Sequence, residues 1–276
     1  MASEKIDPAE ALRRLGEAGD GPHDIARAAL MLAALDHSGR SLEPYEKHLV
    51  DIAEAAKRDL RSVLHAEDAG RALSALMVGR FGYDGDRLTY DDSRNADLME
   101  VIDRRRGMPV ALGILYMHAA RAAGLDAAGL NTPGHFLLRI AMRGSGALLD
   151  PFNGGAAIDR ERLGRPPAMG TPSPEDPRLA ESVTDAEVLL RLENNLKLRA
   201  LNAGERTRAL EIAKRMVLVA PRRPELWIDL ARLSEAGGSL GAARHAYEAC
   251  LTLVKPGAAL HNEAALGLAG LKRRLN

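Results

Sequence analysis

Two side chains capable of acid–base chemistry lie at opposite ends of a predicted β-hairpin. His135 opens the short apolar run HFLLRIAM, and Asp150 lies within the run ALLDPF. The polar, glycine-rich stretch Arg143–Gly146 separates the two runs and is typical of a hairpin turn. Because a hairpin brings its open ends together, we expect His135 and Asp150 to approach each other. A carboxylate that fixes an imidazole tautomer prepares that imidazole to take a proton from a nucleophile.

A helix is predicted over 110–123, with Pro109 at its first turn. A helix N-terminus suits a catalytic thiolate, because the helix dipole favours negative charge there. Pro109 has neither a thiol nor a hydroxyl group. Proline is favoured at the first helical position because its fixed φ suits a helix start. We therefore assign Pro109 a structural role, which leaves the acid–base pair without a nucleophile.

Candidate replacements for this nucleophile are weak. Cys250 is the single cysteine, and we interpret it as a small core residue of the C-terminal helical region. Thr132 lies just before the histidine, and Tyr116 lies two turns into the helix, so either could be proposed as a substitute. Water activated by His135 and Asp150 is a further alternative.

The polar residues around these positions have structural as well as functional interpretations. His135 could be a general base, a ligand-binding donor or a brace of the hairpin. Asp150 could orient His135 or cap the strand end, since Asp-Pro often starts a turn. Asn153 could contact a ligand, although Asn-Gly-Gly most simply forms a turn with positive φ. We expect Asn95 and Arg106 to organise loops around the helix start.

The other histidines show no metal-binding spacing. We expect helices to carry five of them: His23, His37, His48, His65 and His118. The sequence has no His-Glu-x-x-His motif, no Walker loop and no glycine fingerprint for a dinucleotide. Gly144-Ser145-Gly146 is a hairpin tip and not the Gly-x-Ser-x-Gly turn of serine hydrolases. These patterns predict no metal and no cofactor.

The composition argues against nucleic-acid and membrane binding. Lys and Arg number 38, as do Asp and Glu, so the 276-residue chain has a formal net charge of zero. The short basic run 104–106 is typical of a solvated helix end or of structural ion-pair donors. We find no apolar run of the ~18 residues that a membrane span needs. The charged N-terminal sequence lacks an apolar signal core, which predicts a soluble cytoplasmic protein.

The chain divides by pattern into three parts. Apolar residues at spacings of three and four predict helices over most of the first 80 residues and again beyond 178. The segment 165–177 contains five prolines, which favours a linker because proline interrupts helices and strands. We therefore predict a first domain over 1–164, the linker 165–177 and a helical domain over 178–276.

The C-terminal helical region repeats at an interval of 34 residues. This interval separates Leu196 from Leu230 and Ala209 from Ala243, and two prolines close the units at almost the same spacing. Paired helices with small residues at their crossing and a closing proline are typical of tetratricopeptide repeats. The second unit keeps the expected aromatic residues, whereas Glu193 replaces the early aromatic in the first. The final run HNEAALGLAGLKRRL is a candidate capping helix.

These motifs together resemble the transglutaminase-like superfamily. The resemblance lies in Leu-x-x-Val-x-x-Arg-Arg-Arg-Gly-x-Pro at 98–109, Arg-x-x-Gly at 121–124, Pro-Gly-His-Phe at 133–136 and Asp-Pro-Phe-Asn-Gly-Gly at 150–155. It implies a papain-like Cys-His-Asp core. The histidine falls on His135, the aspartate on Asp150 and the cysteine on Pro109. The chain is most similar to bacterial members with C-terminal tetratricopeptide repeats, the Sir-B-type regulators.

The predicted fold is α+β and mostly helical. It combines a papain/transglutaminase-like core and a short antiparallel sheet with a C-terminal helical repeat. We expect a non-catalytic protein-interaction or regulatory adaptor that binds a protein or peptide partner through the repeat. The alternative is an amide hydrolase or acyl transferase that uses His135 and Asp150 with a non-cysteine nucleophile or activated water. Direct DNA binding is disfavoured by the zero net charge. The oligomeric state stays open.

Overall fold

The computed structural model describes residues 7–130, 132, 136–158 and 181–275. Its helices and its small antiparallel sheet confirm the predicted mostly helical α+β class. The chain forms two compact units, which we call the central unit (residues 20–189) and the terminal unit (residues 1–19 and 190–276). The predicted proline-rich linker 165–177 lies outside the described residues.

The helices of the central unit begin where the sequence supplies caps. Asp24 accepts from the backbone N–H of Arg27, and Asp97 accepts from that of Glu100, so each carboxylate satisfies an N–H group that its helix leaves free. The helices are α2 (Ile25–Ala34), α3 (Glu43–Asp59), α4 (Ala66–Ser74), the π-helix η1 (Ala75–Arg80), α5 (Leu98–Arg104) and α6 (Pro109–Ala122). A 3₁₀ turn, η2 (Ser93–Asn95), precedes α5.

The antiparallel sheet has the strand order β3-β4-β5-β6. Its strands are β3 (Asp126–Leu130), β4 (Leu137–Met142), β5 (Ser145–Asp150) and β6 (Ala156–Ala157). The predicted hairpin is confirmed as β4 and β5, joined at Arg143 and Gly144, whose φ values are 48° and 82°. Two consecutive positive φ values match the two-residue turn that suits the right-handed twist of paired strands.

A second, parallel pair of very short strands was not foreseen. It joins β1 (Asp84–Gly85) to β2 (Arg106–Gly107), with Asp84 opposite Arg106 and Gly85 opposite Gly107. This pair ties the loop after η1 to the residues that lead into α6.

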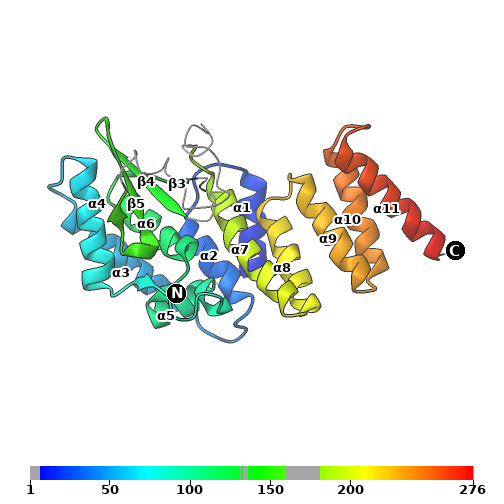
Figure 1. Ribbon diagram of the computed structural model, residues 1–276, viewed down its shortest axis with the longest axis horizontal. Helices are drawn as coiled ribbons and strands as arrows, with labels where there is room; N and C mark the ends of the chain where they lie inside the picture. The colour runs from blue at the N-terminus through cyan, green and yellow to red at the C-terminus, as the bar shows by residue number, and fades with distance from the viewer. Residues whose placement is uncertain (1–6, 131, 133–135, 159–180, 276) are drawn as a thin grey trace, which may run out of the picture. The chain divides into compact units, whose positions relative to one another are not determined.

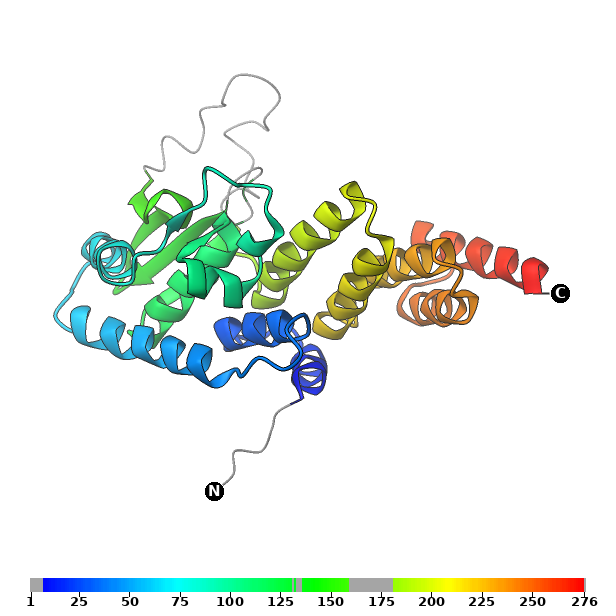
Figure 2. The ribbon, with the colours of Figure 1, turned by 90° about the horizontal axis from the view of Figure 1, so that it is seen from below.

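Helix α6 is the centre of the central unit. Eleven of its fourteen residues are buried, and apolar residues occupy every side of it, as expected for a helix that is covered all round. It contacts strands β3 and β4 as well as α2, α3 and α5, and Figures 1 and 2 show it between the sheet and the helices that precede it in the chain. The sheet also packs against α4, where the side chains of Leu149 and Ile140 lie against Gly70.

The terminal unit consists of helices. They are α1 (Pro8–Ala18), α8 (Arg206–Val219), α9 (Pro224–Ala236), α10 (Leu240–Leu253), α11 (Ala259–Leu275) and the part of α7 (Asp185–Asn202) that begins at Leu190. Helix α1 packs on α8, and a Cβ at Gly16 would lie 2.1 Å from the carbonyl oxygen of Leu218. Cys250 is fully buried in a cluster with Ala243 and Tyr247, so it is a core residue as the sequence suggested.

Candidate functional site

The start of α6 is built by backbone contacts. Pro109 occupies the first turn and is buried, and Met108 precedes it with an extended backbone. The N–H of Met108 donates to the carbonyl oxygen of Asn95 at 2.9 Å, and the carbonyl of Met108 accepts the first helical bond from Leu112. Proline gives up no hydrogen bond here, because first-turn N–H groups lack helical partners. The position is therefore well made for a helix start and presents no reactive atom.

Asp150 caps the end of strand β5. Its Oδ1 accepts from the backbone N–H groups of Phe152 and Asn153 at 3.0 and 3.2 Å, and its Oδ2 accepts from the Asn153 side-chain amide at 2.7 Å. These bonds enclose the 3₁₀ turn η3 (Pro151–Asn153). Gly154 and Gly155 follow with φ values of 67° and 72°, a conformation that glycine adopts without strain. Three donors thus already engage this buried carboxylate.

Asn153 has partners at both ends of its amide. Its nitrogen donates to Asp150, and its oxygen accepts from Arg87 Nη2 at 3.0 Å. Arg87 also donates to the carbonyl oxygen of Phe152 at 3.1 Å and to Asp84 at 3.1 Å. Arg87 therefore joins strand β1 to turn η3, and it was not singled out from the sequence.

His135 lies outside the described residues, together with Pro133 and Gly134. The next residue, Phe136, is buried and its ring lies on Gly113 and Gly129. A Cβ at Gly113 would be 2.2 Å from the Phe136 ring, so only glycine permits this approach. Because Gly113 is four residues after Pro109, the ring contacts α6 one turn beyond the helix start.

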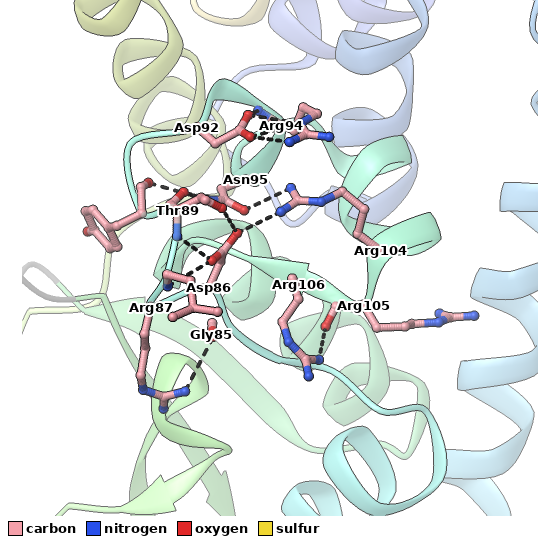
Figure 3. A network of polar contacts seen from close by, with 12 residues as sticks. Gly85, Asp86, Arg87, Thr89, Asp92, Arg94, Asn95, Arg104, Arg105 and Arg106 are labelled. Carbon is pink, nitrogen blue, oxygen red and sulfur yellow. Dashed lines mark hydrogen bonds and ion pairs between the residues drawn. The ribbon is translucent and has the colours of Figure 1, made fainter.

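A polar network holds the loop before α5 against the helix start (Figure 3). Asp86 accepts from Arg104 Nη2 at 2.7 Å, from the Thr89 hydroxyl at 2.6 Å and from the Thr89 N–H at 2.9 Å. The hydrogen bonds from Thr89 lower the pKa of Asp86 most, and the bond from Arg104 lowers it further. Asp86 is 6% exposed, so this pair is a structural ion pair of the loop.

Asn95 links the same loop to the backbone before Pro109. Its side-chain nitrogen donates to the carbonyl oxygen of Thr89 at 2.6 Å, and its side-chain oxygen accepts from Arg104 Nη1 at 3.1 Å. Arg106 is exposed and donates to the carbonyl oxygens of Gly82 and Arg105. Both residues organise loops around the start of α6, as their positions in the sequence suggested. The spacing Asp86-x-x-Thr89 was the signal that could have revealed Asp86.

The substitute nucleophiles lie in unfavourable surroundings. The Tyr116 hydroxyl is buried and has no hydrogen-bond partner among the described residues, and burial raises the pKa of this phenol. Thr132 is 6% exposed. Burial also raises the pKa of the Cys250 thiol in the terminal unit. A raised pKa keeps the hydroxyl or thiol protonated, which opposes nucleophilic attack.

The histidines are placed differently from the prediction that helices carry all five. His48 and His118 lie in helices. His23 precedes α2, His65 immediately precedes α4, and His37 follows the end of α2. Among the described residues, no group of three or more His, Cys, Asp and Glu side chains could hold a metal ion. Within the same part of the chain, no helix combines the length and apolar character needed to cross a membrane.

Helix α6 packs against β3 and β4, and Asp150 ends strand β5, which is the arrangement that the resemblance to the transglutaminase-like superfamily implies. The sequence model of the transglutaminase-like superfamily matches residues 43–194, which is more than half of the chain. The protein belongs to this superfamily.

Similar proteins carry the designation UPF0162. A UPF0162 protein of Xylella fastidiosa is 28% identical over 210 residues, which cover 74% of this chain and 75% of that protein. A UPF0162 protein of Pseudomonas aeruginosa is 34% identical over 131 residues, 46% of this chain and 47% of that protein. F-box only protein 21 of Mus musculus is 33% identical over 82 residues, 30% of this chain and 13% of that protein. No solved structure matches the chain.

Proposed function

We propose that this protein is a non-catalytic member of the transglutaminase-like superfamily that acts as a protein-interaction or regulatory adaptor. The observation that carries the proposal is Pro109, which occupies the buried helix start to which the resemblance assigns the nucleophile. A pyrrolidine ring can neither attack a carbonyl group nor transfer a proton. The same residue is a favourable helix start, which explains how the fold is kept without the chemistry.

The surroundings of Asp150 and Tyr116 support the same proposal. The Asp150 carboxylate already accepts three hydrogen bonds from η3, which accounts for its presence without a catalytic role. The Tyr116 hydroxyl, a candidate substitute, is sealed inside the central unit. These observations favour the adaptor over the alternative of an amide hydrolase or acyl transferase that uses His135 and Asp150.

The helices of the terminal unit support an interaction module related to tetratricopeptide repeats, as in the Sir-B-type regulators. Helices α9 and α10, of 13 and 14 residues, pack against each other, and α11 packs on α10. Leu198 and Leu266, which are two repeat intervals apart, are 49% and 73% exposed. Exposed leucines at equivalent repeat positions suit contact with an extended peptide or a helix of a partner. We infer action in the cytoplasm.

Acyl chemistry is tested with the purified full chain. Hydroxyl- and thiol-directed acyl probes and a panel of ester and amide substrates are applied to the wild type and to His135→Ala. Both proteins carry Cys250→Ala, so that the core thiol contributes no labelling. The proposal expects no turnover and equal labelling of the two proteins. Turnover or labelling that His135→Ala abolishes would establish the enzymatic alternative.

Partner binding is tested by affinity purification from the native host with quantitative mass spectrometry. Leu266→Glu places a charge on the exposed repeat position of α11. Leu64→Glu is the matched control, because Leu64 is also exposed and lies in the central unit. We expect a stoichiometric partner that the wild type and the control retain and that Leu266→Glu loses. Equal retention by all three proteins contradicts the assignment to this surface.

A further inference from the structure

A surface cavity of the central unit lies away from Pro109 and Asp150. Its volume is about 350 Å³, within the range of small-ligand pockets. It lies between the first half of α3 and the end of α5, and its polar lining residues are Tyr45, Lys47, His48, Asp51, Asp103 and Arg105. No part of the proposed adaptor role uses these side chains.

Arg105 is the residue that distinguishes this cavity. It ends α5 in a left-handed conformation with φ of 55°, which a residue other than glycine adopts at a cost in backbone strain. Its Nη1 donates to the Tyr83 hydroxyl at 2.5 Å and to His48 Nε2, and the guanidinium lies 4.9 Å above the Tyr83 ring. These contacts hold a half-buried cation in one orientation at the cavity wall.

The other edge of the Arg105 guanidinium has no partner in the described part of the chain. Both side-chain hydrogen bonds of Arg105 use Nη1, which leaves the N–H groups of Nε and Nη2 free. Among the described residues, no carboxylate lies within the 4.0 Å ion-pair distance of this guanidinium. Nε and Nη2 form the flat two-pronged edge that arginine uses to bind a carboxylate with two parallel hydrogen bonds.

The acids of the cavity already have cationic partners. Asp103 accepts from Arg40 Nη2 at 2.7 Å and from the Tyr45 hydroxyl at 2.9 Å. Asp51 pairs with Lys47 at 3.1 Å. His48 adds no charge at neutral pH, because burial and then the nearby Arg105 lower its pKa to about 4. Arg40 is shared with Glu100 at 3.0 Å. Arg105 is therefore the cation of this cavity wall that has no ion-pair partner among the described residues.

We propose that this cavity binds a carboxylate group, which occupies the free Nε–Nη2 edge of Arg105. A carboxylate supplies the direct ion-pair partner that this guanidinium lacks among the described residues. A phosphate dianion fits less well, because one guanidinium edge carries a single positive charge. The carboxylate can come from a small organic acid or from the C-terminus of a peptide, since both present the same group to the guanidinium.

The test is a nuclear magnetic resonance titration of the full chain that follows the Arg105 Nε–H and His48 ring signals. The probes are acetate, N-acetyl-Ala-Ala with a free carboxylate, the amide of that dipeptide, and inorganic phosphate. Arg105→Gln removes the proposed fork, and Arg105→Lys keeps the charge without the fork. Arg106→Gln is the matched control, because this neighbouring arginine contacts only backbone carbonyl oxygens in the described part of the chain.

The expected result is saturable binding of acetate, of the dipeptide acid, or of both, and which probe binds more tightly identifies the source of the carboxylate. Binding weakens at least tenfold in both Arg105 variants and is unchanged in Arg106→Gln. Thermal unfolding of each variant confirms that it is folded. The proposal is overturned if neither carboxylate saturates, if the dipeptide amide or phosphate binds as tightly, or if folded Arg105 variants bind like the wild type.

Discussion

At the scale of single residues, the positions that the resemblance marks as catalytic also have structural roles in the fold. Pro109 begins α6, and Asp150 caps η3, so each has a structural task that requires no substrate. Tyr116 is the exception, because its buried hydroxyl has no partner among the described residues. A buried polar group without a hydrogen bond reduces stability, since it has lost its hydration without replacement.

Tyr116→Phe therefore leaves the free energy of unfolding unchanged or raises it by up to about 1 kcal/mol, because no hydrogen bond is lost. The matched change Tyr83→Phe removes a hydroxyl that accepts from Arg105, and we expect it to lower that free energy by about 1–3 kcal/mol. Urea denaturation of the two variants measures both values. A loss for Tyr116→Phe as large as that for Tyr83→Phe would show that Tyr116 has a partner in solution, such as a buried water.

At the scale of elements, the contact of α6 with the sheet is the most demanding fit in the central unit. It depends on Gly113, where the Phe136 ring approaches the helix backbone. Glycine inside a helix is intrinsically unfavourable by about 1 kcal/mol relative to alanine. Its presence is explained by packing, because a methyl group at this position would overlap the ring.

Gly113→Ala is expected to destabilise the protein by about 1–3 kcal/mol despite the better helix propensity of alanine, because an overpacked core must shift. Gly241→Ala in α10 is the control. A Cβ at Gly241 would meet nothing within 4 Å, so this variant should gain up to about 1 kcal/mol. Differential scanning calorimetry compares the two melting temperatures. Stabilisation by Gly113→Ala would contradict the close approach of the ring.

At the scale of the whole molecule, positive and negative charges are equal in number, but one titratable group has a strongly shifted pKa. The formal net charge is zero at pH 7, so no net-charge repulsion opposes folding at neutral pH. His48 is the shifted group, because burial first and Arg105 second lower its pKa from the ordinary 6.5 to about 4. Lys47 and His118 lower this pKa as well, whereas Asp51 raises it.

His48 thus makes the folded state less stable in mild acid. The unfolded chain takes up this proton near pH 6.5 and the folded chain only near pH 4, so stability is full above about 6.5 and falls between these values. We expect the wild type to lose about 1–2 kcal/mol over this window from His48 alone. His48→Gln should show a correspondingly smaller loss between pH 7 and pH 4.5 in urea denaturation. If the free energy of unfolding falls equally in the two proteins as the pH is lowered, the lowered pKa of His48 is refuted.

Local chemistry in the sequence was enough to predict several features. The hairpin follows from the polar, glycine-rich stretch Arg143–Gly146 between two apolar runs, and the start of α6 follows from Pro109. The turn after Asp150 follows from Asp-Pro and Gly-Gly. Each of these features depends on residues a few positions apart, so backbone preferences alone specify it.

Only the tertiary structure showed the contacts between distant segments. Arg105 meets His48 across 57 positions and Arg104 meets Asp86 across 18. Both arginines belong to a run whose pattern indicated a solvated helix end or structural ion-pair donors, and their partners could not be read from it. The grouping of α1 with α8 and the parallel pair of β1 with β2 are equally non-local. Such contacts depend on how buried surfaces of separate elements fit, and no pattern within one element carries that information. The sequence alone therefore determined that proline occupies position 109, where the resemblance places the nucleophile. The fold decided which charged side chain lines a cavity without an ion-pair partner among the described residues.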